Sequence, residues 1–139
     1  MRPFPFLLLP AMLLALAGCD GATTADAARD GASAMEFRGQ RPCVDCNGIE
    51  SWLRLEQSGK ARPYRLVENY LGADHQRQFE DEGQWQAEGD LLRLRSRGGF
   101  ERMYARQPDG SLQARDAHGR PLPAAADDIL LPVTFDNMR

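Results

Sequence analysis

The chain has 139 residues, with 17 lysine and arginine residues against 20 aspartate and glutamate residues and a formal net charge of −3. The sequence contains no basic cluster with interleaved aromatic residues, so its charge pattern gives no indication of a nucleic-acid partner. This length suits a single folded domain. Three cysteines, Cys19, Cys43 and Cys46, are the residues most informative about function.

The N-terminal residues are typical of a lipoprotein signal. Arg2 supplies a positive charge, and the apolar stretch over residues 4–17 is long enough for a signal-peptide core but short for a membrane span. It ends in Leu16-Ala17-Gly18-Cys19, a pattern that predicts cleavage before the cysteine and acylation of it. We therefore expect a signal peptide over 1–18 and acyl chains such as palmitate on Cys19. More than one acyl chain makes membrane anchoring stable.

A flexible tether is expected over residues 19–34, because this segment has no large apolar side chain to bury. The folded domain is then expected over 35–139. Asp20 follows the predicted lipidation site, and in enterobacteria an aspartate there tends to retain a lipoprotein in the inner membrane. Other proteobacteria follow different sorting rules. The sequence thus predicts a lipid anchor facing the periplasm and leaves the choice of membrane open.

Short alternating segments begin at Met35 and are typical of antiparallel β structure. The expected strands cover residues 35–38, 49–56, 64–70, 76–81, the segment around Trp85, 91–95, 100–105 and 112–115. A helix stays possible at 49–56, since Ile49, Trp52 and Leu53 share a helical face. Residues 129–135 are expected to form a last edge strand or to pack across one end.

Turn signals recur along this region, at Gly39, Glu82-Gly83, Gly89, Gly98-Gly99, Gly110 and Gly119. No helical pattern alternates with the strands, which disfavours a βαβ fold. We predict an all-β protein, a small antiparallel lipocalin-like barrel of about eight strands.

The pair Cys43 and Cys46, in a CxxC motif, has three candidate uses: a disulfide, a soft-metal site or a redox enzyme. A disulfide across so short a loop adds only about 2 kcal/mol of stability. Two thiolates favour copper(I), and a tetrahedral zinc site would need two further ligands. A thiol oxidoreductase is disfavoured, because such enzymes place the motif in a βαβ setting. Copper(I) at the reduced pair and a passive disulfide both stay open.

Other side chains offer weaker candidates. His75, His118, Met35 and Met103 are possible additional metal ligands, although each fits a surface histidine or a core methionine better. The aromatic residues serve either the core or a ligand platform at the barrel mouth; they are Trp52, Trp85, Tyr64, Tyr70 and Tyr104. The many carboxylates fall where exposed strand faces are expected and are interpreted as solvated. No hydrolase arrangement occurs, so we predict no enzymatic activity and no required cofactor.

The run Phe37-Arg38-Gly39 followed by Pro42-Cys43-Val44-Asp45-Cys46-Asn47-Gly48-Ile49 resembles the N-terminal domain of NlpE-like copper resistance lipoproteins. The resemblance continues through Leu53-Arg54-Leu55, Glu82-Gly83-Gln84-Trp85 and Gly89-Asp90-Leu91, and covers about residues 35–123. The best-known members carry a second, C-terminal OB-type domain with its own cysteines. The matched region is the first domain alone, so properties of the second are not expected here.

The resemblance implies a lipocalin-like barrel on a periplasm-facing lipoprotein, with a role in copper tolerance and in activating an envelope-stress sensor kinase, including on surface contact. On this interpretation Cys43 and Cys46 are the functional pair, binding copper(I) when reduced. The alternative is a lipocalin-like carrier of a small molecule, with a passive CxxC disulfide.

Overall fold

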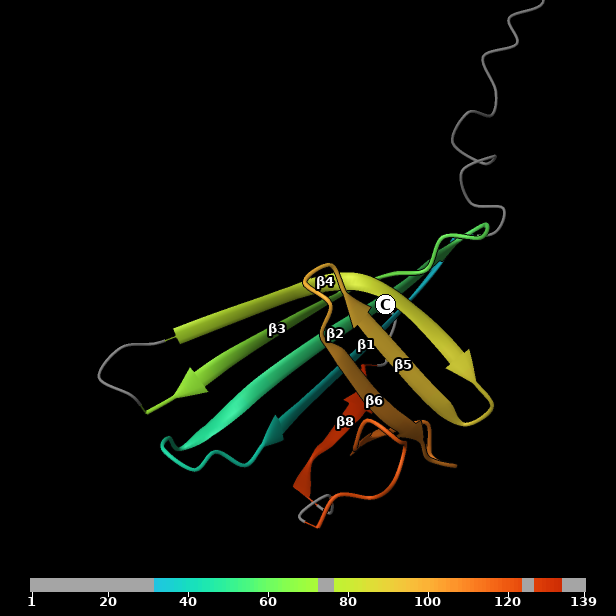
Figure 1. The fold of residues 1–139 in the computed structure, drawn as a ribbon. Helices are drawn as coiled ribbons and strands as arrows, with labels where there is room; N and C mark the ends of the chain where they lie inside the picture. Colours follow the sequence, from blue (N-terminus) through green and yellow to red (C-terminus); the bar gives the residue numbers. More distant parts are fainter. Residues whose placement is uncertain (1–31, 73–76, 124–126, 134–139) are drawn as a thin grey trace, which may run out of the picture.

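The computed structural model describes residues 32–72, 77–123 and 127–133. Eight strands form one sheet: β1 (Ala32–Arg41), β2 (Gly48–Ser58), β3 (Pro63–Leu71), β4 (Arg77–Glu88), β5 (Leu91–Ser96), β6 (Glu101–Arg106), β7 (Leu112–Arg115) and β8 (Ile129–Pro132). Each strand pairs antiparallel with the next, and β8 pairs with β1, so the sheet closes into a barrel. Figure 1 shows β1, β2, β3 and the first part of β4 fanned along one side, with β4 then bending over to run beside β5. The predicted fold class is confirmed.

Alternation of side chains determines the interior of the barrel. In β2, the residues at positions 51, 53 and 55 are buried while their neighbours are exposed or half-buried, as expected for a strand with one face on the core. The possible helix at 49–56 is therefore wrong. The core consists mainly of leucines and aromatic residues: Phe37, Leu53, Leu55, Tyr64, Leu66, Trp85, Leu92, Leu94, Tyr104, Leu112, Ala114 and Leu130.

The predicted turn at Glu82-Gly83 is wrong, because both residues lie inside the long strand β4. The first part of β4 pairs with β3 and the part from Gly83 onward pairs with β5. Gly83 is buried where these pairings overlap, and a β-carbon there would overlap the carbonyl oxygen of Arg95. The glycine thus permits close approach of two backbones rather than ending a strand.

The strand β1 is longer at both ends than predicted. It begins at Ala32, so residues 32–34, expected in the tether, instead pair with Glu56, Gln57 and Ser58 of β2. Backbone hydrogen bonds of a ladder need no large side chain, which is why composition missed them. The strand also continues through Gly39 to Arg41. At Gly39 a β-carbon would overlap the carbonyl oxygen of Ile129, so this glycine lets β8 close the barrel.

We expect Gly83→Ala to destabilise the barrel by about 1–3 kcal/mol, the usual cost of overpacking a closely packed site. The added methyl group has to displace the backbone of Arg95 rather than a flexible side chain. Urea denaturation measures this change. Gly89→Ala serves as a reference. Gly89 has open space around it and a φ of 60°, so any loss of stability there comes from the backbone conformation and not from crowding. A Gly83→Ala protein as stable as the wild type would contradict the proposed backbone contact.

Within the described residues, no helix is long and apolar enough to cross a membrane.

Candidate functional site

The CxxC motif lies in the loop that joins β1 to β2, residues 42–47, here called the CxxC loop. Pro42 directly follows β1, and a proline has no N–H group to donate to the sheet. Gly48 begins β2 with a φ of 142°, a backbone conformation that favours glycine. These two residues turn the chain out of one strand and back into the next.

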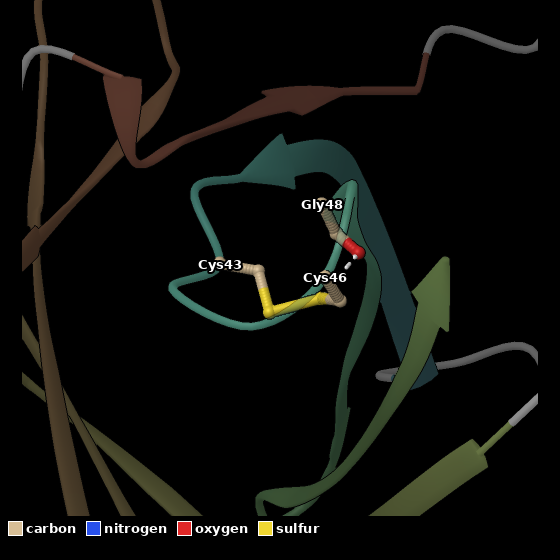
Figure 2. The surroundings of a disulfide bond; sticks show 3 residues. All are labelled: Cys43, Cys46 and Gly48. Carbon is tan, nitrogen blue, oxygen red and sulfur yellow. Dashed lines mark hydrogen bonds between the residues drawn. A yellow bond between two sulfur atoms is a disulfide. The ribbon is translucent and has the colours of Figure 1, made fainter. Parts of the chain in front are cut away.

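A disulfide joins Cys43 and Cys46, whose Cα atoms lie 5.2 Å apart. Figure 2 shows the sulfur of Cys46 directed toward the carbonyl oxygen of Gly48, at a distance of 3.3 Å. The bonded sulfur carries no proton, so only the reduced thiol of Cys46 can donate a hydrogen bond to this oxygen. The sequence left open a disulfide and a copper(I) site at the reduced pair. The structure describes the disulfide form.

The CxxC loop is attached to the end of β3. The backbone N–H of Asn47 donates to the carbonyl oxygen of Leu71, at 2.9 Å. Next to it, Gly72 has a φ of 74°, and a β-carbon there would overlap the side chain of Asn47. The base of the loop is therefore held in place by the neighbouring strand.

The tip of the loop is open to solvent. Val44 is 99% exposed, and both cysteines are partly exposed. A partly exposed sulfur is accessible to a reductant or a metal ion. Asp45, between the cysteines, is also exposed, and its negative charge disfavours a free thiolate nearby. The site is thus better suited to binding a metal ion, which supplies its own positive charge, than to strong nucleophilic catalysis.

The structure does not bring the other predicted ligands to the cysteines. Met35 lies in β1 six residues before Arg41, about 20 Å along the strand. Met103 is buried in β6, where it lies beside Gly119, and His118 occupies the turn between Asp116 and Arg120. His75 is outside the described residues. Among the residues that are described, no group of three or more His, Cys, Asp or Glu side chains could hold a metal ion.

The aromatic candidates separate into two groups. Tyr64, Trp85 and Tyr104 belong to the core, and the indole N–H of Trp85 donates to the carbonyl oxygen of Glu56 at 2.7 Å. Trp52 is half-buried and follows the outward positions of β2, and Tyr70 is half-buried near the end of β3. Burial raises the pKa of the Tyr104 hydroxyl, which therefore stays protonated at neutral pH.

One candidate functional residue was not predicted, because all the carboxylates in the sequence were interpreted as solvated. Glu68 in β3 is only 1% exposed. Its carboxylate accepts hydrogen bonds from Arg102, at 3.0 and 3.1 Å, and from Arg41, at 2.8 Å. Glu68 continues the buried alternation of Tyr64 and Leu66, and that pattern is the signal that would have revealed it.

Arg41 connects this buried charge to the CxxC loop. It is the last residue of β1, two positions before Cys43, and it also lies 3.7 Å from the carboxylate of Asp128. Burial raises the pKa of Asp128, while the charge of Arg41 acts in the opposite direction. We call Arg41, Glu68, Arg102 and Asp128 the Glu68 cluster. It links β1, β3, β6 and the residue that precedes β8 to one another inside the barrel.

The fold and the loop together define a class: a small closed antiparallel barrel whose first hairpin carries a disulfide-bonded CxxC motif. Residues 37–125 match the model of the NlpE N-terminal domain, and the chain belongs to this family.

Known relatives agree with this assignment. Lipoprotein NlpE of Escherichia coli is 32% identical over 117 residues, which cover 79% of this chain and 48% of the relative. The crystal structure of the Cpx pathway activator NlpE from Escherichia coli has a TM-score of 0.55 at 32% identity, covering 63% of this chain and 45% of that one. The chain therefore spans about half the length of these relatives.

A crystal structure of a lipoprotein candidate from Shewanella oneidensis has a TM-score of 0.53 at 23% identity, covering 69% of this chain and 84% of that one. At this identity the likeness concerns the fold alone.

Proposed function

We propose that this protein is a lipid-anchored, periplasm-facing component of an envelope-stress response, in which the CxxC loop is the sensing element. The observation that carries the proposal is membership of the NlpE family, together with the likeness to a protein described as an activator of the Cpx pathway. Its partner in this role is an envelope-stress sensor kinase. The protein acts by binding and not by catalysis, and this function is favoured over that of a small-molecule carrier.

The anchor is the acylated Cys19. The support is the run Leu16-Ala17-Gly18-Cys19 after an apolar leader, and the relative that is itself named a lipoprotein. Because β1 begins at Ala32, residues 20–31 connect the lipid to the barrel. Fully extended, they reach about 40 Å, which allows the CxxC loop to meet a partner above the membrane surface.

Cys19→Ala is expected to remove the lipid and release the protein from membranes, because the anchor is then gone. Membrane fractionation with metabolic labelling by a fatty acid measures both effects. Cys43→Ser is the matched control: it also removes a cysteine, yet it should keep full membrane association. Unchanged sedimentation of the Cys19→Ala protein with membranes would contradict the proposed anchor.

The stimulus that the loop senses is copper(I). Two thiolates from one short turn are soft ligands, which copper(I) prefers over harder oxygen donors. The exposure of Val44 and the partial exposure of both cysteines leave the pair accessible once it is reduced. Oxidation removes both ligands at once, so the response to copper depends on the redox state of the periplasm.

A transcriptional reporter of the envelope-stress pathway tests the whole proposal. Expression of the chain should raise reporter output, and copper should raise it further. The Cys43→Ser/Cys46→Ser protein should keep the first increase and lose the second, while Cys19→Ala changes the position of the protein relative to the membrane and should reduce both. A reporter indifferent to expression of the wild-type chain would refute the proposed function.

A further inference from the structure

A hollow of about 500 Å³ lies on the barrel beside the CxxC end of β1, β2 and β3. Its lining includes Arg38, Gln40, Glu50, Trp52 and Asn69. A second hollow of about 260 Å³ shares Glu50 and Asn69 with it and reaches Gln78 on β4. We call the two together the outer groove. The larger hollow alone is within the size range of small-molecule sites, about 300–1,000 Å³.

Strand register explains why polar side chains gather here. Gln40 pairs with Glu50, Glu50 with Asn69, and Asn69 with Gln78, so one row of residues crosses four adjacent strands. All four are exposed, and in β2 and β3 they alternate with the buried Ser51 and Glu68. Side chains paired across strands on one face stand side by side. The row therefore presents three carboxamides and a carboxylate to the same surface.

An aromatic residue occupies the adjacent row. Trp52 pairs with Arg38 on one side and with Val67 on the other. Its indole N–H donates to Glu36, at 3.4 Å, which restrains the orientation of the ring. The outer groove therefore combines a flat aromatic ring with planar hydrogen-bonding groups, and the ring position is set before any ligand arrives.

Four polar side chains of the larger hollow, unlike Trp52, have no partner among the residues that the structure describes. Two neighbouring outer-face arginines are paired, in Arg54–Glu36 at 2.7 Å and Arg65–Glu80 at 2.9 Å. By contrast, the side chains of Arg38, Gln40, Glu50 and Asn69 form no hydrogen bond or ion pair with any residue that the structure describes. These four side chains therefore keep their hydrogen-bonding groups available to an external partner.

The chemistry of the lining selects the kind of partner. Carboxamides both donate and accept hydrogen bonds, guanidinium only donates and carboxylate only accepts. Sugar hydroxyl groups also donate and accept, and the C–H face of a sugar ring packs on an indole face through dispersion and the ring quadrupole. One arginine and one glutamate in the larger hollow balance in charge, and Arg77 in the smaller hollow leaves the outer groove with a single excess positive charge, too little to favour a polyanion. We propose that the outer groove binds a neutral oligosaccharide.

A peptide fits this site less well. The commonest way for an extended peptide to join a sheet is as an added strand at a free edge. Here β2 is paired with β1 and β3 along its length, and β3 is paired with β2 and β4. A peptide would thus have to rely on side-chain contacts alone. The oligosaccharide site goes beyond the proposed stress function and does not depend on it.

Isothermal titration calorimetry of the full chain in detergent, with chitotetraose, cellotetraose and maltotetraose as separate probes, tests the proposal. We expect at least one sugar to bind saturably, with a stoichiometry near one. Trp52→Ala should lower the affinity about tenfold or more, because stacking area is lost, and Asn69→Ala should lower it severalfold. Arg65→Ala is the matched control on the same face and should bind like the wild type. Trp52→Leu replaces Trp52→Ala if the latter fails to fold, because leucine keeps apolar bulk at this position but has no aromatic face.

Three outcomes would overturn the proposal. The first is the absence of saturable binding by any of the three sugars. The second is binding that survives both the Trp52 and the Asn69 substitutions, since the sugar then lies elsewhere. The third outcome uses a further probe, a cell-wall stem peptide without sugar. If this peptide binds and its binding depends on Trp52, while none of the sugars binds, the outer groove is a peptide site.

Discussion

Glu68→Gln is expected to lower the free energy of unfolding by about 3 kcal/mol, the lower end of the range for a buried ion pair that loses one partner. Glutamine keeps the shape of the side chain but removes the charge that Arg41 and Arg102 share. The two arginines are 31% and 28% exposed. They can therefore turn partly toward water, which is why the loss is not expected at the upper end of the range.

Equilibrium denaturation in urea measures this loss, and Glu80→Gln is its matched control. Glu80 makes a comparable ion pair with Arg65, at 2.9 Å, but both side chains are well exposed, at 44% and 49%. An exposed pair contributes about 1 kcal/mol or less. Equal losses for the two variants would mean that the Glu68 cluster does not hold the barrel together.

The second large effect concerns copper. The reduced chain is expected to bind one copper(I) ion, and the Cys43→Ser/Cys46→Ser chain none, since both soft ligands are gone. Oxidised protein should not bind either. Competition with a chromophoric copper(I) chelator under reducing conditions measures the affinity. Because thiolates are the ligands and protons compete for them, the affinity should fall as the pH is lowered.

Met35→Leu, Met103→Leu and His118→Ala are the controls for this titration. The first residue is far along β1 from the loop, the second is buried in β6 and the third lies in a separate turn. Each variant should therefore bind copper(I) like the wild type. If the double serine variant still competes for copper(I) while one of these three does not, the copper site is not in the CxxC loop.

Local alternation predicted a strand well only where the strand keeps the same pairing partners along its length. Where a strand stays in one environment, as β2 and β3 do, alternation located it to within about two residues. Where a strand changes partners, as β4 does at Gly83, the same reasoning saw two strands and a turn. A glycine that lets two backbones approach and a glycine that turns the chain look alike in sequence, because each lacks a side chain.

The candidate sites show the same division. The CxxC motif is visible in the sequence because its two cysteines are close along the chain. The Glu68 cluster is not, because Arg41 and Arg102 lie 27 and 34 positions away and meet Glu68 only when the barrel closes. The row formed by Gln40, Glu50, Asn69 and Gln78 likewise depends on the register of three strand pairs.

The sequence by itself determined the strand faces, the β class and the cysteine pair, because each depends on side chains a few residues apart. Only the tertiary structure decided that Glu68 is buried with two arginines, that β8 closes the barrel at Gly39, and that Gln40, Glu50 and Asn69 line one hollow with Trp52. The physical reason is that burial and pairing of a polar group depend on which distant strand lies beside it. That choice is made by the packing of the whole barrel and not by any local pattern.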